Sequence, residues 1–128
     1  MSDLLQDISD YFVDSALATT VYVDFEPEVP DSIIAVHEYK GGPVPLHATV
    51  AQRSVQVVVR EKSPAVAKAK AYELYNSLHA DDKYILLTND RFGLITLRNT
   101  PIKTKVDEAN RHYYKFNIGI TTTIEGMV

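Results

Sequence analysis

The chain has 128 residues and a net charge of −4, with 45% hydrophobic and 23% charged residues. It contains no cysteine, which excludes disulfides, thiolate nucleophiles and zinc–thiolate sites and suits a reducing cytoplasm. This size and composition predict a single domain, residues 1–128, that buries its own core without metal or cross-links.

The N-terminal segment predicts an amphipathic helix over about residues 4–16. Leu5, Ile8 and Phe12 fall on one stripe at helical spacing, and Asp3 is a candidate N-cap. The segment lacks the basic leader of a signal peptide, and no stretch of the chain approaches the ~20 apolar residues that span a bilayer. We therefore expect a soluble, unprocessed protein.

A strand and a proline-rich connection follow the helix. Residues 20–25 alternate with period two, which predicts a strand with Val21, Val23 and Phe25 on one face. Two prolines in residues 26–31 end this strand, because proline has no N–H to donate to a sheet. These residues are therefore expected to form an exposed connector.

Residues 33–39 form the second predicted strand, which leads into a loop over residues 40–47. Glycine permits positive φ and proline fixes its own φ, so Gly41-Gly42-Pro43 predicts a stiff loop of defined shape. Residues 49–61 alternate again, which predicts a long strand with one buried and one solvated side. The buried side is expected to hold Ala51, Val55, Val57 and Val59, and the solvated side Gln52, Ser54, Gln56 and Arg60.

A central helix is predicted from Ser63 to about His79, because serine suits the N-cap and proline the first helical position. Its buried stripe is expected to contain Ala67, Ala71, Leu74 and Leu78. The pattern then predicts a strand at residues 84–88, a hairpin loop at 89–93 and a strand at 94–97.

The remaining sequence predicts one more strand. Residues 102–111 are polar and charged, which indicates an exposed hairpin arm or a mobile loop. The last strand alternates, with His112, Tyr114, Phe116, Ile118 and Ile120 on one side and Tyr113, Lys115 and Asn117 on the other. Strands outnumber the two separate helices. The sequence therefore predicts an α+β fold, with a largely antiparallel β-sheet on which one N-terminal helix and one central helix pack.

The charges are distributed unevenly along the chain. Residues 1–39 hold nine acids and no lysine or arginine (−9), whereas residues 40–128 hold eight acids and thirteen bases (+5). An acidic flank of one copy could therefore meet a basic flank of the next, in the head-to-tail manner that closes rings. The inter-subunit contact on this hypothesis is the solvated side of the long strand, Gln52, Ser54, Gln56 and Arg60. The alternative is that the acids only solvate the first helix and the connector.

The sequence gives little support to catalysis. None of the four histidines has the His-x-x-x-His spacing that metal sites favour, and no serine lies between glycines. Asp81-Asp82 is more typical of a solvated turn than of a catalytic carboxylate pair, and Gly41-Gly42-Pro43 lacks the helix start that phosphate binding needs. We therefore expect no enzyme activity and no catalytic, cofactor-binding or metal-binding residues.

Nucleic-acid binding is a stronger rival. The long strand and the central helix could form a basic surface, and eight tyrosines could stack on bases. The basic residues concerned are Arg53, Arg60, Lys62, Lys68 and Lys70. A pI near 5.5 argues against this function, because such domains usually carry a clear excess of positive charge.

The order of parts in the chain resembles a known family. The parts are an initial helix, strands around a Gly-Gly-Pro loop, a strand ending in Val57-Val58-Val59-Arg60, a helix rich in alanine, tyrosine and leucine, Asn99-Thr100-Pro101, and a final Tyr-x-x-Phe-Asn-Ile strand at 113–118. This pattern is similar to the small tail terminator proteins of long-tailed bacteriophages, also called tail-completion or minor capsid proteins. The resemblance covers nearly the whole chain.

The resemblance implies a structural role in a virion. It implies a homo-oligomer, a hexameric ring, that caps the tail tube, stops its polymerisation and provides the docking face for the head. The implied partners are the tail tube protein and a head-completion or connector protein, with DNA passing through the ring without specific binding and no membrane. The implied location is the head-proximal end of the virion tail, after assembly in the host cytoplasm. Alternatives are a head–tail connector (neck) component and a small α+β ligand-binding or enzymatic domain.

Two connections are candidates for the contact with the tube or the head, since loops on a rigid sheet are the parts free to touch a partner. One is the stiff loop and the other is the charged segment before the last strand. The predicted contact residues are Lys40, Gly41, Gly42, Pro43, Lys103, Lys105, Asp107 and Arg111.

Overall fold

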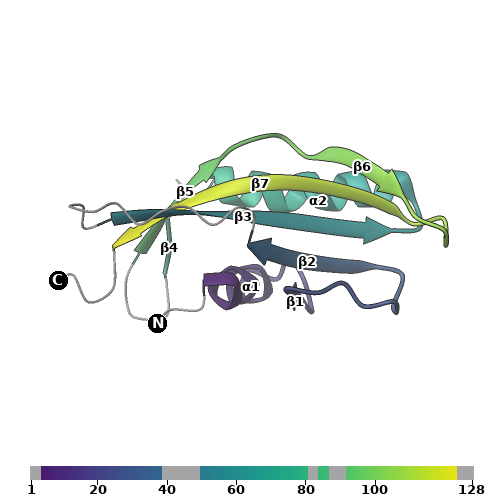
Figure 1. Cartoon of the computed structure of the whole chain (residues 1–128), viewed down its shortest axis with the longest axis horizontal. Coiled ribbons are helices and arrows are strands. Elements are labelled where there is room, and N and C mark those ends of the chain that lie inside the picture. The colour runs from purple at the N-terminus through teal and green to yellow at the C-terminus, as the bar shows by residue number, and fades with distance from the viewer. Residues whose placement is uncertain (1–3, 39–49, 81–83, 87–91, 124–128) are drawn as a thin grey trace.

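The computed structural model describes the chain except residues 1–3, 39–49, 81–83, 87–91 and 124–128 (Figure 1). Its elements are α1 (Leu4–Asp14), β1 (Tyr22–Val23), β2 (Ile33–Glu38), β3 (Val50–Glu61), α2 (Pro64–Ala80), β4 (Tyr84–Leu86), β5 (Phe92–Leu97), β6 (Ile102–Val106) and β7 (His112–Thr123). The predicted α+β class with two helices is confirmed. The predicted Asp3 cap, the loop at Lys40-Gly41-Gly42-Pro43 and the Asp81-Asp82 turn lie outside the described residues.

Seven strands form one mostly antiparallel sheet, in the order β1-β2-β3-β7-β5-β4 with β6 also paired to β7. The 12-residue strand β3 pairs with β7 from Val50↔Thr123 to Glu61↔His112. Along its other edge, β7 pairs with β6 near its start and with β5 near its end. Among the described strands only β1 and β2 run parallel. The β3–β7 pair is therefore the centre of the fold.

Both helices pack on one face of the sheet, which we call the helical face; Figure 1 shows α2 behind β3 and β7. The core between helices and sheet includes Leu5, Ile8 and Phe12 of α1 and Ala71, Leu74 and Leu78 of α2. The sheet contributes Val55, Val57, Val59, Phe116, Ile118 and Ile120, among others. The predicted buried stripes of both helices are thus confirmed. The predicted start of α2 is also confirmed, because Ser63 Oγ accepts a hydrogen bond from Val66 N–H at 3.3 Å.

The prediction for the first strand is wrong in the length of the strand and in the position of Phe25. Only Tyr22 and Val23 are in β1, and Phe25, which was expected on one strand face with Val21, is 55% exposed whereas Val21 is buried. The cause is Asp24, whose φ of 65° breaks the extended backbone. A short polar side chain tolerates this left-handed conformation, and the chain turns there so that Phe25 faces solvent.

The opposite face of the sheet, which we call the open face, has a small buried cluster of its own. The cluster consists of Ile33, Ala35, Val58 and Tyr113. The prediction of a solvated side is therefore wrong at Ser54 and Arg60, which are both buried. Gln56 on the same side is half-buried.

Residues 102–111 form an exposed hairpin arm, one of the two predicted forms. The strand β6 is exposed along its whole length and pairs with β7, with a bulge between Lys103 and Lys105. The turn closes where Asp107 N–H donates to Arg111 O at 3.0 Å, and Asn110 takes a φ of 63°. Asparagine is one of the few residues that adopts this φ readily.

Candidate functional site

The segment between β1 and β2, residues 24–32, is held to the sheet by a buried arginine; we call this segment the connector. Arg60 on β3 is 2% exposed. Its Nε donates to the Asp31 carbonyl at 3.1 Å, and its Nη2 donates to the carbonyls of Pro27 at 2.5 Å and Pro30 at 2.8 Å. A buried cation is tolerated here because oxygen acceptors surround it. The connector therefore has a fixed shape although most of it is exposed.

A second arginine attaches the connector to the hairpin arm. Arg111 is 5% exposed, and its Nη1 donates to the Glu28 carbonyl at 2.6 Å. Its guanidinium lies 3.3 Å from the Glu28 carboxylate and 3.7 Å from that of Asp31, and its Nε donates to Asp107 Oδ2 at 2.8 Å. We call Arg60, Arg111 and Asp107 the latch. Three carboxylates around one guanidinium leave the Arg111 end of the latch with excess negative charge.

Tyr113 joins the two arginines of the latch. Its hydroxyl donates to Asp107 Oδ2 at 3.1 Å, and two cations lie close to its ring. Lys105 Nζ is 4.5 Å from the ring centroid and the Arg60 guanidinium carbon is 5.9 Å from it. Such contacts between a cation and an aromatic face add to the stability of the cluster.

The latch changes the acidity of Asp107. Burial acts to raise the pKa of this carboxyl group. The Arg111 backbone N–H and guanidinium and the Tyr113 hydroxyl donate hydrogen bonds to it, and together with the positive charge of Arg111 they outweigh burial and lower the pKa to about 2. The ionised form is thus favoured in the folded protein. Its contribution to stability is complete above the ordinary pKa of 3.8 and is lost as the pH falls toward 2.

A pH series should reveal this contribution. We expect Asp107→Asn to lower the free energy of unfolding at pH 7, and the deficit relative to the wild type to shrink as the pH falls from about 4 to about 2. Urea denaturation at several pH values measures it. Glu108→Gln, at the exposed neighbouring carboxylate, is the matched control and should show a much smaller deficit at pH 7. A deficit for Asp107→Asn that stays constant down to pH 2 would contradict the assigned acidity.

The open face carries positive charge along β7 and its neighbours. Lys115 is paired with Val58 of the open-face cluster, so its side chain lies on this face. Arg98 crosses the same face, since a Cβ added to Gly119 would lie 2.6 Å from Arg98 Nε. Within the spans of β3, β5, β6 and β7 the one carboxylate is Glu61, and its pairing with His112 places it on the helical face. The open face of these strands is therefore basic.

Exposed apolar side chains lie beside both charged regions. On the connector, Phe25 is 55% exposed and Val29 is 77% exposed. On the hairpin arm, Ile102 is 54% exposed, and its pairing with Lys115 places it on the open face. Apolar side chains held in place at the surface are typical of protein contacts.

Some of the acidic side chains of residues 1–39 form ion pairs within the subunit. Glu26 lies 2.7 Å from His37 Nε2, and Glu38 forms an ion pair with Arg53. These pairs and the Arg111 contacts neutralise carboxylates within the subunit. The uneven charge distribution of the sequence had suggested that these carboxylates would contact a neighbouring copy. Asp10, Asp14 and Asp24 remain exposed.

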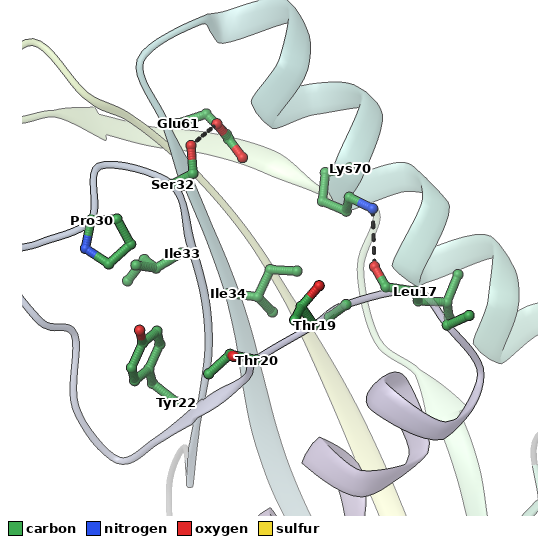
Figure 2. A pocket seen from close by; sticks show the side chains of 12 residues that line it. Leu17, Thr19, Thr20, Tyr22, Pro30, Ser32, Ile33, Ile34, Glu61 and Lys70 are labelled. Atoms are coloured by element: carbon green, nitrogen blue, oxygen red, sulfur yellow. Dashed lines mark hydrogen bonds between the residues drawn. The ribbon is translucent and has the colours of Figure 1, made fainter.

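A groove of about 640 Å³ lies where the chain passes from α1 to β1, beside β2 and α2 (Figure 2). Its charged side chains already have partners in the protein. Lys70 Nζ donates to the Leu17 carbonyl at 3.0 Å, and Ser32 Oγ donates to Glu61 Oε1 (Figure 2). The described residues hold no group of three or more histidine, cysteine or acidic side chains suited to a metal ion. No described helix is long and apolar enough to cross a membrane.

The predicted contact residues with the tube or the head differ in their exposure to solvent. Lys103 and Lys105 are exposed on β6, as a contact with a partner requires. Arg111 requires a correction, because its guanidinium is buried in the latch and is not available to a partner, and Asp107 is bound to it. Lys40, Gly41, Gly42 and Pro43 lie outside the described residues, as does the side chain of Gln52.

The sequence analysis missed the exposed apolar residues of the connector and the basic residues of the open face. Phe25 was assigned to one strand face with Val21 and Val23, and Lys115 was placed on one side of its strand without a role. One signal was available for Val29, which stands between Glu28 and Pro30 in a segment predicted to be exposed. The latch was not visible in the sequence, because Arg60 and Arg111 are 51 positions apart.

Comparisons with known proteins agree with this fold. The chain matches the family model described as bacteriophage tail terminator protein over residues 3–124. No curated protein matches it significantly. A solved structure titled "Virion of native gene transfer agent (GTA) particle" contains a chain of the same fold, with a TM-score of 0.67 and 16% sequence identity, covering 94% of this chain and 95% of that one. The protein is thus a structural phage tail protein, and it belongs to the bacteriophage tail terminator family.

Proposed function

We propose that this protein forms a hexameric ring that caps the tail tube, stops its polymerisation and presents the docking face for the head. The match to the tail terminator family over residues 3–124 carries this proposal. The whole chain acts as one domain, at the head-proximal end of the tail, and is assembled there in the host cytoplasm. Its partners are the tail tube protein and a head-completion or connector protein.

We infer that the hairpin arm touches an axial partner. Its strand β6 is exposed at every residue and pairs only with β7 among the described strands. The turn that carries it is fixed by the latch, so the arm can present Lys103 and Lys105 without a large loss of conformational freedom on binding. The loop at Lys40-Gly41-Gly42-Pro43 remains a second proposed contact.

Replacing Lys103 and Lys105 together with serine should leave the protein folded and the ring assembled, because both side chains are exposed and the contact of Lys105 with the Tyr113 ring contributes little at an exposed site. We expect tails of uncontrolled length, or complete tails that do not join heads. Electron microscopy of virions assembled with this variant measures both outcomes. The matched control replaces Lys62 and Lys68, two exposed lysines near the start of α2, with serine.

The same experiment separates a terminator from a neck component. A terminator variant changes the distribution of tail lengths, whereas a variant of a head–tail connector leaves tail length normal and affects joining alone. Normal tail lengths and normal joining in the Lys103→Ser, Lys105→Ser virions would place the axial contact elsewhere on the protein.

A further inference from the structure

We propose that the connector of one copy docks on the open face of the next copy, at a basic patch made of Arg98, Ile102 and Lys115. This inference rests on the proposed ring and names the two surfaces that build it. Phe25 and Val29 pack against Ile102, and the carboxylates of the connector face Arg98 and Lys115. The two surfaces differ, so the contact is head-to-tail and closes into a ring when the rotation between copies allows it.

The connector is suited to be one side of this contact because it is both rigid and exposed to solvent. Arg60 and Arg111 fix its backbone through four carbonyls, those of Pro27, Glu28, Pro30 and Asp31. Its apolar side chains nevertheless face solvent, with Val29 at 77% exposure. A surface that is already ordered loses little conformational entropy on binding. Phe25 makes an edge-to-face contact with the Tyr22 ring of its own subunit and is still 55% exposed, so part of its ring remains available to a partner.

The basic patch is suited to be the other side. It lies along β7 at Lys115 and Gly119, where Arg98 covers the glycine, and it includes the exposed side chain of Ile102. The connector brings the opposite sign, since Asp24, Glu28 and Asp31 are exposed and the three carboxylates around Arg111 outnumber its single positive charge. Charge complementarity and apolar contact therefore favour the same pairing.

One copy can use both surfaces at once. Arg111 holds the connector near the start of β7. The patch lies farther along β7 and extends to β5 and β6, which pair with the other edge of β7. Each copy thus offers a free connector to one neighbour and a free patch to the other.

Complementation between two variants tests this arrangement in solution. Val29→Asn removes an apolar contact of the connector without adding charge, and Lys115→Glu reverses a charge of the patch, so each variant alone should associate at least about tenfold more weakly than the wild type. An equal mixture of the two should form dimers that grow no further, because each dimer joins the one intact connector to the one intact patch. Analytical ultracentrifugation over a range of concentrations gives the sizes. Lys68→Glu, an equal charge change on the exposed side of α2, is the control and should assemble like the wild type.

The outcomes separate this contact from the proposed function. If the wild type forms oligomers and both variants associate as it does, or their mixture forms no dimers, the docking is wrong while the ring stands. If the wild type stays monomeric at every concentration, also with tail tube protein present, both proposals are overturned. Thermal melts check that each variant is folded. Val29→Ser and Ile102→Ser repeat the test with neutral changes, and unimpaired association of both would also overturn the docking.

Discussion

Replacing Arg60 with methionine should lower the free energy of unfolding by about 3–4 kcal/mol. Methionine keeps much of the volume but donates no hydrogen bond. The carbonyls of Pro27, Pro30 and Asp31 then lose their partner, and each acceptor left without one costs roughly 1–3 kcal/mol, less where water can reach it. Removing a buried charge returns part of that cost. Urea denaturation at pH 7 measures the change.

Arg53→Met is the matched control for Arg60. Arg53 lies on the same strand, but it is partly exposed and pairs with Glu38 at the surface. Exposed ion pairs contribute about 0–1 kcal/mol, so this change should be small. The Arg60 variant should also be cut faster by a protease within residues 24–32, because the connector is released. Equal stability of the two variants would mean that the connector keeps its shape without Arg60.

Replacing Leu74 with alanine should lower the free energy of unfolding by about 2–5 kcal/mol. Leu74 is fully buried in the core between α2 and the sheet, so the change removes apolar contacts and leaves a cavity. For a chain of this size the melting temperature should fall by roughly 8–20 °C. Differential scanning calorimetry measures it.

Val66→Ala provides the comparison for Leu74 in the same helix. Val66 is a large apolar residue that is half-exposed, and surface substitutions usually change stability by less than about 0.5 kcal/mol. Similar melting temperatures for the two variants would show that the assignment of the buried side of α2 is wrong.

The parts of the fold that follow local rules could be read from the sequence. The stripe from Ala67 to Leu78 repeats at helical spacing, and Ser63-Pro64 marks a helix start, so α2 was predicted closely. The alternation of the long strand likewise identified Val55, Val57 and Val59 as core residues. In each case the residues that decide the structure are close together in the sequence.

The parts of the fold that depend on contacts between residues far apart in the sequence could not be predicted from the sequence. The alternation of the long strand correctly predicted which side of the sheet Arg60 faces. It did not predict that another segment covers Arg60 on that side. The cover is the connector, whose position depends on Asp24 adopting a positive φ and on Arg111 binding Glu28 from the other end of the chain. Neither feature has a periodic signal. For the same reason the charge split predicted a contact between copies but could not show which acids are already paired.

The central ladder of the sheet has a consequence for how the protein is made. Strand β3 pairs with β7, and the partners Glu61↔His112 and Val50↔Thr123 are 51 and 73 positions apart. Contacts over such separations form late, because a long loop must close first. On the ribosome, β3 therefore stays without its main partner until β7 has been synthesised. The edge of β3 that pairs with β7 is then open, so we expect a nascent chain that ends before β7 to be a better chaperone substrate than the full-length protein.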